Sequence, residues 1–206
     1  MAIIRGTLAD ENGNITLDKE GVLLEQINIA HAAKACGGIV IAQVERIVKA
    51  GSLHPKSVKV PGVSVDYVVV SQPENHMQTI TTQFNAALCG DVRVPVNSLA
   101  PMALDERKVI ARRTALELKP GAITNLGIGI PAGVPSVAAE EGVADQFTLS
   151  VESGITGGIP AQLGDFGTAY NADAIIEQSL QFDFYDGGGL DASFLGLAQA
   201  DNHGNV

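Results

Sequence analysis

Apolar residues in the first third of the chain follow two different spacings. Residues 22–36 place their apolar side chains on one face at helical spacing, which predicts a helix that ends at Gly37. Residues 39–44 and 65–70 are apolar runs rich in β-branched side chains, which is typical of buried strands. This part of the chain therefore predicts strands that pack against a helix.

Strands and helices alternate again later in the chain. Asp105 is a predicted N-cap for a helix that runs to Leu118, and residues 122–126 predict a strand. A second helix is predicted to begin near Pro131, and residues 147–151 predict the next strand. Because strands alternate with helices, the sequence predicts an α/β fold with mainly parallel sheets.

Residues 71–104 differ from the segments on both sides. They are rich in Gln, Asn, Thr and Pro and show no clear period. We interpret them as a connection between two domains. The predicted domains are then residues 1–70 and residues 105–206.

A seven-residue turn motif occurs twice. Ala-Asp-Glu-Asn-Gly-Asn-Ile occupies residues 9–15 and Ala-Asp-Asn-His-Gly-Asn-Val occupies residues 200–206, so four of the seven positions are identical. Chance is one explanation, because Asp, Asn and Gly dominate turns of every kind. The other is that the chain holds incomplete parts of two similar halves of a longer protein. Around the first copy, residues 15–17 are predicted to pair with residues 3–7 as a hairpin.

Composition and charge narrow the partners to be expected. The chain has a formal net charge of −10 and a sequence pI of about 4.7, and it shows no basic patch. We therefore expect neither nucleic acid nor an anionic membrane surface as a partner. Cys36 and Cys89 are interpreted as reduced packing residues, and the start of the chain shows no leader, which predicts a cytoplasmic protein. The four histidines share no ligand spacing, so no metal site is predicted.

The candidate chemistry centres on Glu152. This glutamate directly follows the predicted strand 147–151, at the carboxyl end where α/β folds place ligands. Two glycine clusters, Gly127 with Gly129 and residues 187–189, are candidates to supply backbone N–H groups to a developing oxyanion. A carboxylate nucleophile needs no partner base, because it is already ionised at neutral pH. The alternative is an exposed loop carboxylate with no catalytic role.

Three segments resemble the family I coenzyme A transferases. They are Asn-Leu-Gly-Ile-Gly-Ile-Pro at residues 125–131, Leu-Ser-Val-Glu-Ser-Gly at residues 149–154 and Phe-Asp-Phe-Tyr-Asp-Gly-Gly-Gly-Leu-Asp at residues 182–191. The resemblance runs through nearly the whole chain and is strongest to acetate and propionate coenzyme A transferases, in which both halves lie in one polypeptide. It implies two similar open α/β halves, with the end of the first in residues 1–70 and the start of the second in residues 105–206.

The resemblance also implies a ping-pong mechanism. Glu152 would attack an acyl-CoA thioester to give a mixed anhydride, and the released CoA thiolate would then form a glutamyl-CoA thioester. A short-chain carboxylate would reverse these steps and leave as the new acyl-CoA. Coenzyme A is then a substrate, no cofactor is tightly bound, and the full-length protein is expected to be a homo-oligomer.

The same resemblance assigns the glycines. Gly127 and Gly129 would lie on the oxyanion side of the site. Gly187, Gly188 and Gly189 would lie beside the thioester, with Gly188 and Gly189 in contact with coenzyme A. Because contacts from absent parts of both halves would be missing, we expect the isolated chain to be inactive.

Three other functions remain open on the sequence alone. Gly127, Gly129 and Ala132 fit the looser dinucleotide-binding fingerprint, and Glu152 follows where a ribose-binding acid would lie. An acyl-CoA hydrolase would use the same residues with water as the final acceptor. A non-catalytic assembly domain would need none of them.

Overall fold

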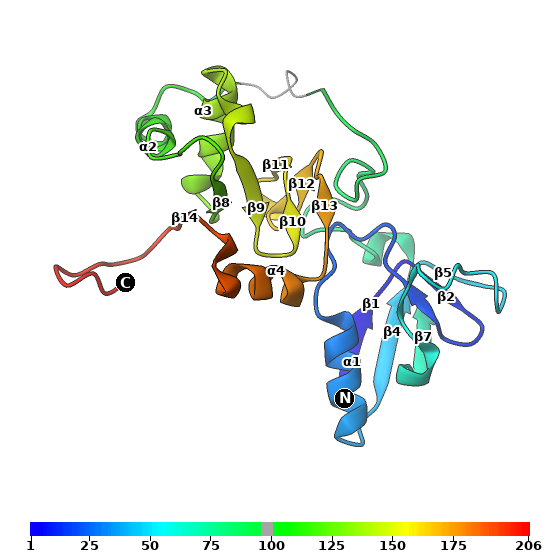
Figure 1. Ribbon diagram of the computed structural model, residues 1–206. Helices are drawn as coiled ribbons and strands as arrows, with labels where there is room; N and C mark the ends of the chain where they lie inside the picture. The colour runs from blue at the N-terminus through cyan, green and yellow to red at the C-terminus, as the bar shows by residue number, and fades with distance from the viewer. Residues whose placement is uncertain (96–100) are drawn as a thin grey trace.

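A computed structural model describes residues 1–95 and 101–206, which form two neighbouring α/β regions (Figure 1). The first region is built on a parallel sheet of order β1-β4-β7, and one face of this sheet packs against α1. Alternate residues of β1 and β4 are buried, as the pleat of a strand requires. These elements are β1 (Ala2–Arg5), β4 (Val40–Val44), β7 (Tyr67–Val70) and α1 (Gln26–Ala35). The predicted strands and helix of this region are confirmed, although the helix begins later than predicted.

A second, four-stranded sheet of order β5-β2-β3-β6 adjoins the first. Its strands are β2 (Leu8–Asp10), β3 (Ile15–Thr16), β5 (Arg46–Val48) and β6 (Val58–Val60). The predicted hairpin between residues 3–7 and 15–17 is wrong for residues 3–6, although the Thr7 N–H donates to the carbonyl of Thr16 at 2.7 Å. Ala9 pairs with Ile15, because the tight turn between them fixes the register, while β1 is used by its parallel partner β4.

The second region contains a five-stranded mixed sheet of order β13-β10-β9-β8-β14. The pairs β14–β8 and β8–β9 are parallel, whereas β9–β10 and β10–β13 are antiparallel. Strands β11 and β12 form a separate antiparallel pair. The strands are β8 (Ile123–Leu126), β9 (Thr148–Val151), β10 (Ile155–Thr156), β11 (Ile159–Pro160), β12 (Ala169–Tyr170), β13 (Ala174–Ile175) and β14 (Ala192–Phe194).

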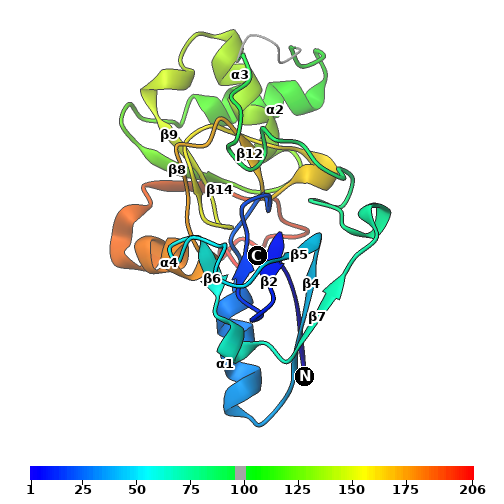
Figure 2. The ribbon, with the colours of Figure 1, turned by 90° about the vertical axis from the view of Figure 1, so that its right-hand side faces the viewer.

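The helices of the second region pack on this sheet. Helices α2 and α3 contact each other and lie at the end of the molecule away from α1 (Figures 1 and 2). Asp105 is the predicted N-cap of α2, and its carboxylate accepts the Lys108 N–H at 3.0 Å. The helix predicted from Pro131 begins as a 3-10 turn that continues into α3. The helices are α2 (Glu106–Ala115), α3 (Val134–Glu140) and α4 (Gln178–Phe184).

Short turns join these elements. Within residues 1–95 and 101–206, five are 3-10 turns and one, η7, is a wide turn that contains Gly188 in a left-handed conformation, with φ of 86°. They are η1 (Gly62–Ser64), η2 (Pro73–Asn75), η4 (Pro131–Gly133), η5 (Ala144–Gln146), η6 (Leu163–Asp165) and η7 (Tyr185–Gly189). Among the described residues, no helix has the length and apolar character needed to cross a bilayer.

Chain segments from before residue 96 reach into the second region. Leu23 forms a parallel bridge with Glu177, and the Leu23 carbonyl accepts the Gln178 N–H at 2.9 Å. Val22 packs against the apolar cluster around Val151. The predicted connection, residues 71–104, is described up to residue 95 and from residue 101, so its middle lies outside the described residues. The described part before the gap contacts the second region through Thr79 and Thr81, which donate hydrogen bonds to Asp165.

The repeated motif has the same geometry in both copies. In the first, the Asp10 carboxylate accepts the N–H of Asn12 at 2.9 Å and of Asn14 at 3.0 Å. In the second, the Asp201 carboxylate accepts the N–H of His203 at 2.8 Å and of Asn205 at 3.0 Å. The glycine of each copy is left-handed, with φ of 80° and 84°. The turn is therefore specified by its own seven residues, whatever lies around it.

His76 is buried in the first region without a close partner. Its side chain is 8% exposed, neither ring nitrogen has a hydrogen bond within the described residues, and Nε2 lies 3.8 Å from Glu20 Oε1. Glu20 is already bound by the Arg5 guanidinium, which also donates to the carbonyl of Met77. Burial lowers the pKa of His76, against the opposing effect of Glu20.

Stability should consequently fall in mild acid. The folded state favours neutral His76, so the unfolded state binds the proton more readily and stability is lost as pH falls below about 6.5. We expect His76→Gln to flatten the dependence of the urea midpoint on pH between about 7 and 5. His31→Gln, at an exposed position on α1, is the matched control and should keep the parent slope. Equal slopes in both variants would contradict this role of His76.

The two turn copies provide an internal comparison. Asp10 is 3% exposed and its turn joins β2 to β3, whereas Asp201 lies in an exposed segment outside any strand. We expect Asp10→Ala to lower the free energy of unfolding by about 2 kcal/mol, because the N–H groups of Asn12 and Asn14 lose their part-buried acceptor. Asp201→Ala should leave the urea midpoint unchanged. Equal midpoints for the two variants would show that the first turn does not depend on its carboxylate.

Candidate active site

Glu152 follows the last residue of β9, and a neighbouring strand holds its carboxylate. Strands β8 and β9 are parallel with Asn125 opposite Ser150, so the end of β8 lies beside the residues that follow β9. Asn125 Nδ2 donates a hydrogen bond to Glu152 Oε2 at 3.0 Å. Asn125 is itself buried, and its Oδ1 accepts the Ser193 hydroxyl at 3.2 Å from the other neighbouring strand, β14. Three adjacent strands therefore fix one carboxylate oxygen.

The turn after Glu152 requires glycine. Gly154 has φ of 105°, and its N–H donates to the carbonyl of Val151 at 3.1 Å. A Cβ at this position would overlap the carbonyl oxygen of Ile176. The Ile176 N–H in turn donates to the Gly154 carbonyl at 2.8 Å. The chain thus reverses sharply into β10, and the Glu152 side chain is left half-buried at the bend.

Glu152 lines a cavity of about 480 Å³. Its polar lining gathers around the carboxylate and includes Asn125 and Ser193. The remaining wall is dominated by large side chains from several separate segments, namely Ile128, Phe166, Phe182, Tyr185, Leu190 and Leu195. Among the described residues that line this cavity, Glu152 is the only one with a charged side chain. The cavity therefore has one polar end and an otherwise apolar surface.

The glycines predicted to join this site lie at different distances from it. Gly127 lines the cavity with Glu152, but its N–H already donates to the carbonyl of Phe194 at 2.9 Å. Gly129 is exposed, with φ of 89°, and is not part of the lining. The lining also omits Gly187, Gly188 and Gly189. Tyr185, two residues before this glycine run, and Leu190, directly after it, both belong to the wall.

Several residues of the site were not singled out from the sequence. Asn125 opens the segment 125–131 that carries the resemblance, but an asparagine near the end of a strand gave no signal for its own role. Tyr185 donates its hydroxyl to Ser150 Oγ at 2.8 Å and thereby ties η7 to β9. Phe166 and Leu195 are far from Glu152 in sequence. A polar residue in a strand that leads into a glycine-rich segment is the one local signal that points to Asn125.

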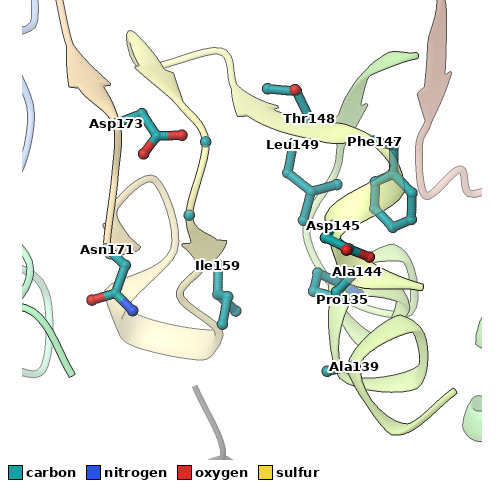
Figure 3. Close-up of a pocket in the computed structure, with 12 residues that line it drawn as sticks. Pro135, Ala139, Ala144, Asp145, Phe147, Thr148, Leu149, Ile159, Asn171 and Asp173 are labelled. Atoms are coloured by element: carbon teal, nitrogen blue, oxygen red, sulfur yellow. The ribbon is translucent and has the colours of Figure 1, made fainter. Parts of the chain in front are cut away.

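A second cavity, of about 440 Å³, lies near the opposite end of β9 from Glu152 (Figure 3). Pro135 and Phe147 lie on one side of it, and Ile159, Asn171 and Asp173 on the other (Figure 3). Both polar groups of this far wall have partners, since Asn171 exchanges hydrogen bonds with the backbone of Val94 and Asp173 pairs with Arg93. Glu152 does not line it, so the first cavity is the candidate active site.

Nothing in the described part of the chain forms a metal centre. No group of three or more His, Cys, Asp or Glu side chains that could hold a metal ion occurs there. Cys36 is exposed and Cys89 half-buried, and both are free thiols. The chemistry available around Glu152 is therefore that of a carboxylate, an amide and two hydroxyl groups next to an apolar surface.

The sequence of this chain is similar to those of coenzyme A transferases. A family model described as Coenzyme A transferase matches residues 1–71. Caffeate CoA-transferase of Acetobacterium woodii is 49% identical over 207 residues, which covers 100% of this chain and 40% of that protein. Acetate CoA-transferase YdiF of Escherichia coli strain K12 is 43% identical over 206 residues, which covers 100% of this chain and 39% of that protein.

Solved structures agree with the sequence comparison. The acyl-CoA transferase YdiF apoenzyme from Escherichia coli O157:H7 superimposes with a TM-score of 0.86 at 41% identity, covering 98% of this chain and 37% of that one. The thioester complex of the same enzyme with CoA gives a TM-score of 0.84 at 41% identity, over 99% of this chain and 39% of that one. The predicted α/β fold is confirmed. The chain belongs to the coenzyme A transferase family, and it spans about 40% of the length of the curated relatives that it matches.

Proposed function

We propose that this chain carries the nucleophile of an enzyme that transfers coenzyme A between an acyl-CoA and a free carboxylate, and that Glu152 is this nucleophile. The observation that supports it best is the carboxylate of Glu152, held through one oxygen by Asn125 at the mouth of an apolar cavity. The other oxygen, Oε1, has no hydrogen bond within the described residues and is available for attack. Relatives named as acetate and caffeate CoA-transferases support the same reaction class.

The proposed reaction needs only an acyl-CoA and a free carboxylate as reactants. Glu152 attacks the thioester carbonyl, the carbon–sulfur bond breaks, and coenzyme A leaves as its thiolate from a mixed anhydride. The thiolate attacks the glutamyl carbonyl, the original carboxylate leaves, and a glutamyl-CoA thioester remains. A second carboxylate then reverses both steps and departs as the new acyl-CoA. The thioester complex known for the Escherichia coli relative supports such an intermediate.

Asn125 has two roles in this sequence of steps. Its amide orients the Glu152 carboxylate before attack, because the amide is itself held by Ser193 and buried between strands. When the glutamyl thioester forms, the same N–H can donate to the carbonyl oxygen that remains on Glu152. The amide can therefore keep Oε2 as its partner both before attack and in the thioester.

An acyl-CoA hydrolase that uses the same residues remains the second candidate. A mixed anhydride and a thioester both react with water, and wall side chains such as Ile128 and Leu195 are 58% and 63% exposed. The transferase is preferred because the relatives are named as CoA-transferases. Coenzyme A is proposed as a substrate and not as a bound cofactor. The cytoplasmic location, the homo-oligomer and the assignments of Gly127, Gly129 and Gly187–Gly189 stay predictions.

A completed enzyme is needed to test the nucleophile. Because the chain spans about 40% of its relatives, residues 1–206 would replace the aligned region of YdiF from Escherichia coli O157:H7. We expect Glu152→Gln in this enzyme to lower acetyl-CoA:propionate transfer by about 10⁴-fold or more, because the attacking group is lost. Mass spectrometry after incubation with acetyl-CoA should find coenzyme A on the peptide that contains residue 152 in the parent enzyme and not in the Glu152→Gln enzyme.

The control for this test is Glu74→Gln, which makes the same chemical change at an exposed position in η2. It should retain the parent rate and the labelled peptide. Transfer at the parent rate by the Glu152→Gln enzyme, or a label on a different peptide, would rule out Glu152 as the nucleophile.

The isolated chain gives a second prediction. We expect residues 1–206 alone to show no detectable acetyl-CoA:propionate transfer, because the relatives contribute more than half of their length from elsewhere. Transfer would be followed by the appearance of propionyl-CoA. A rate equal to that of the completed enzyme would show that these residues contain the whole active site.

A further inference from the structure

We propose that the Glu152 cavity selects an uncharged, bulky and preferably aromatic acyl group, of the size of a phenylpropionyl group. This inference rests on the proposed function, since it assumes that the acyl carbonyl meets Glu152. It goes beyond that function by assigning the chemical class of the acyl group. The cavity volume, its charge and the positions of its aromatic side chains support it independently of one another.

The volume of the cavity is much larger than a short acyl group needs. An acetyl group has three non-hydrogen atoms and displaces only two or three water molecules, each of which occupies about 30 Å³. The cavity of about 480 Å³ lies within the range of roughly 300–1,000 Å³ that is usual for sites of larger ligands. An acetyl group would therefore leave most of the apolar wall in contact with water, whereas a phenylpropionyl group would cover a larger part of it.

The charge of the lining residues disfavours a second carboxylate on the acyl group. Glu152 is the only charged side chain among the described residues that line the cavity, and no Lys, Arg or His accompanies it. A dicarboxylic acyl group such as succinyl would bring a second negative charge close to Glu152 with no cation to balance it. Its desolvation in the apolar part of the cavity would add to the penalty.

Aromatic side chains in the wall favour an aryl group. Phe182 and Tyr185 meet edge to face, with ring centroids 5.9 Å apart and an interplanar angle of 74°. Phe166 contributes a third ring to the same cavity from a separate segment. Rings in such positions attract a further ring through the same edge-to-face geometry. The polar end around Glu152 and Asn125 then receives the carbonyl, and the aryl end meets the rings.

Binding of neutral thioesters to the 206-residue chain tests this selection. The probes are N-acetylcysteamine thioesters of acetic, 3-phenylpropionic and succinic acid, which share one neutral thiol and differ only in the acyl group. We expect calorimetric titration to give a dissociation constant about 10-fold lower for the phenylpropionyl than for the acetyl thioester, because more apolar surface is buried. The succinyl thioester should bind more weakly than the acetyl thioester. Equal affinities, or a preference for succinyl, would overturn the proposal.

Two variants test whether the phenylpropionyl group binds in the Glu152 cavity. Leu195→Ala and Phe182→Ala shorten exposed parts of the wall, since these side chains are 63% and 43% exposed, so the fold should tolerate both. Each should weaken phenylpropionyl binding about fivefold and leave acetyl binding unchanged. Val63→Ala, which removes an exposed apolar side chain in η1, is the matched control and should change neither constant. Unchanged phenylpropionyl binding in both wall variants would place the ligand elsewhere and overturn the proposal.

The same probes separate this inference from the proposed function. In the completed enzyme, a preference for phenylpropionyl-CoA together with no label on Glu152 would support the selection and contradict the nucleophile. Labelling of Glu152 by acetyl-, phenylpropionyl- and succinyl-CoA with equal efficiency would support the nucleophile and overturn the selection.

Discussion

The parallel register between β8 and β9 determines the candidate active site. Asn125 lies opposite Ser150, and this pairing brings the amide of one strand to the carboxylate that follows the other. A shift of one residue would turn Asn125 to the opposite face of the sheet and leave Glu152 without its donor. The buried residues of both strands, Leu126 and Leu149 among them, hold this register because they pack in one apolar cluster with α2 and α3. Packing on one face of the sheet therefore fixes the chemistry at its end.

The sequence predicted those features that depend on neighbouring residues. The helix cap at Asp105, the strand that ends at Glu152 and the repeated turn are all local, because periodicity or a few side chains determine them. The strands β10 and β13 were not predicted, since each has two residues and forms only through its partners. The hairpin error has the same origin: two strands before the turn, β1 and β2, could pair with β3, and only the fold shows that β1 pairs with β4.

The sequence singled out Glu152 as the candidate nucleophile, but it did not predict the residues that surround it. Glu152 stands out because it follows a strand and precedes glycines. The wall of the cavity combines residues such as Phe166, Phe182 and Leu195, which only the folded chain brings together. Glycine clusters gave a partly misleading signal, because the N–H of Gly127 is already bonded to the backbone of Phe194. A glycine-rich segment near a site does not by itself provide backbone N–H groups that are free to bind a ligand.

The contact between Leu23 and α4 limits how this protein can be recombined with its relatives. Residues from near the start of the chain supply a backbone partner to Gln178, whose neighbour Ile176 supports the bend after Glu152. An exchange of modules cut only in the stretch 71–104 would pair a foreign Leu23 segment with a native α4. A chimera that keeps this contact must take the Leu23 segment and α4 from the same parent, although more than 150 positions separate them in the printed sequence.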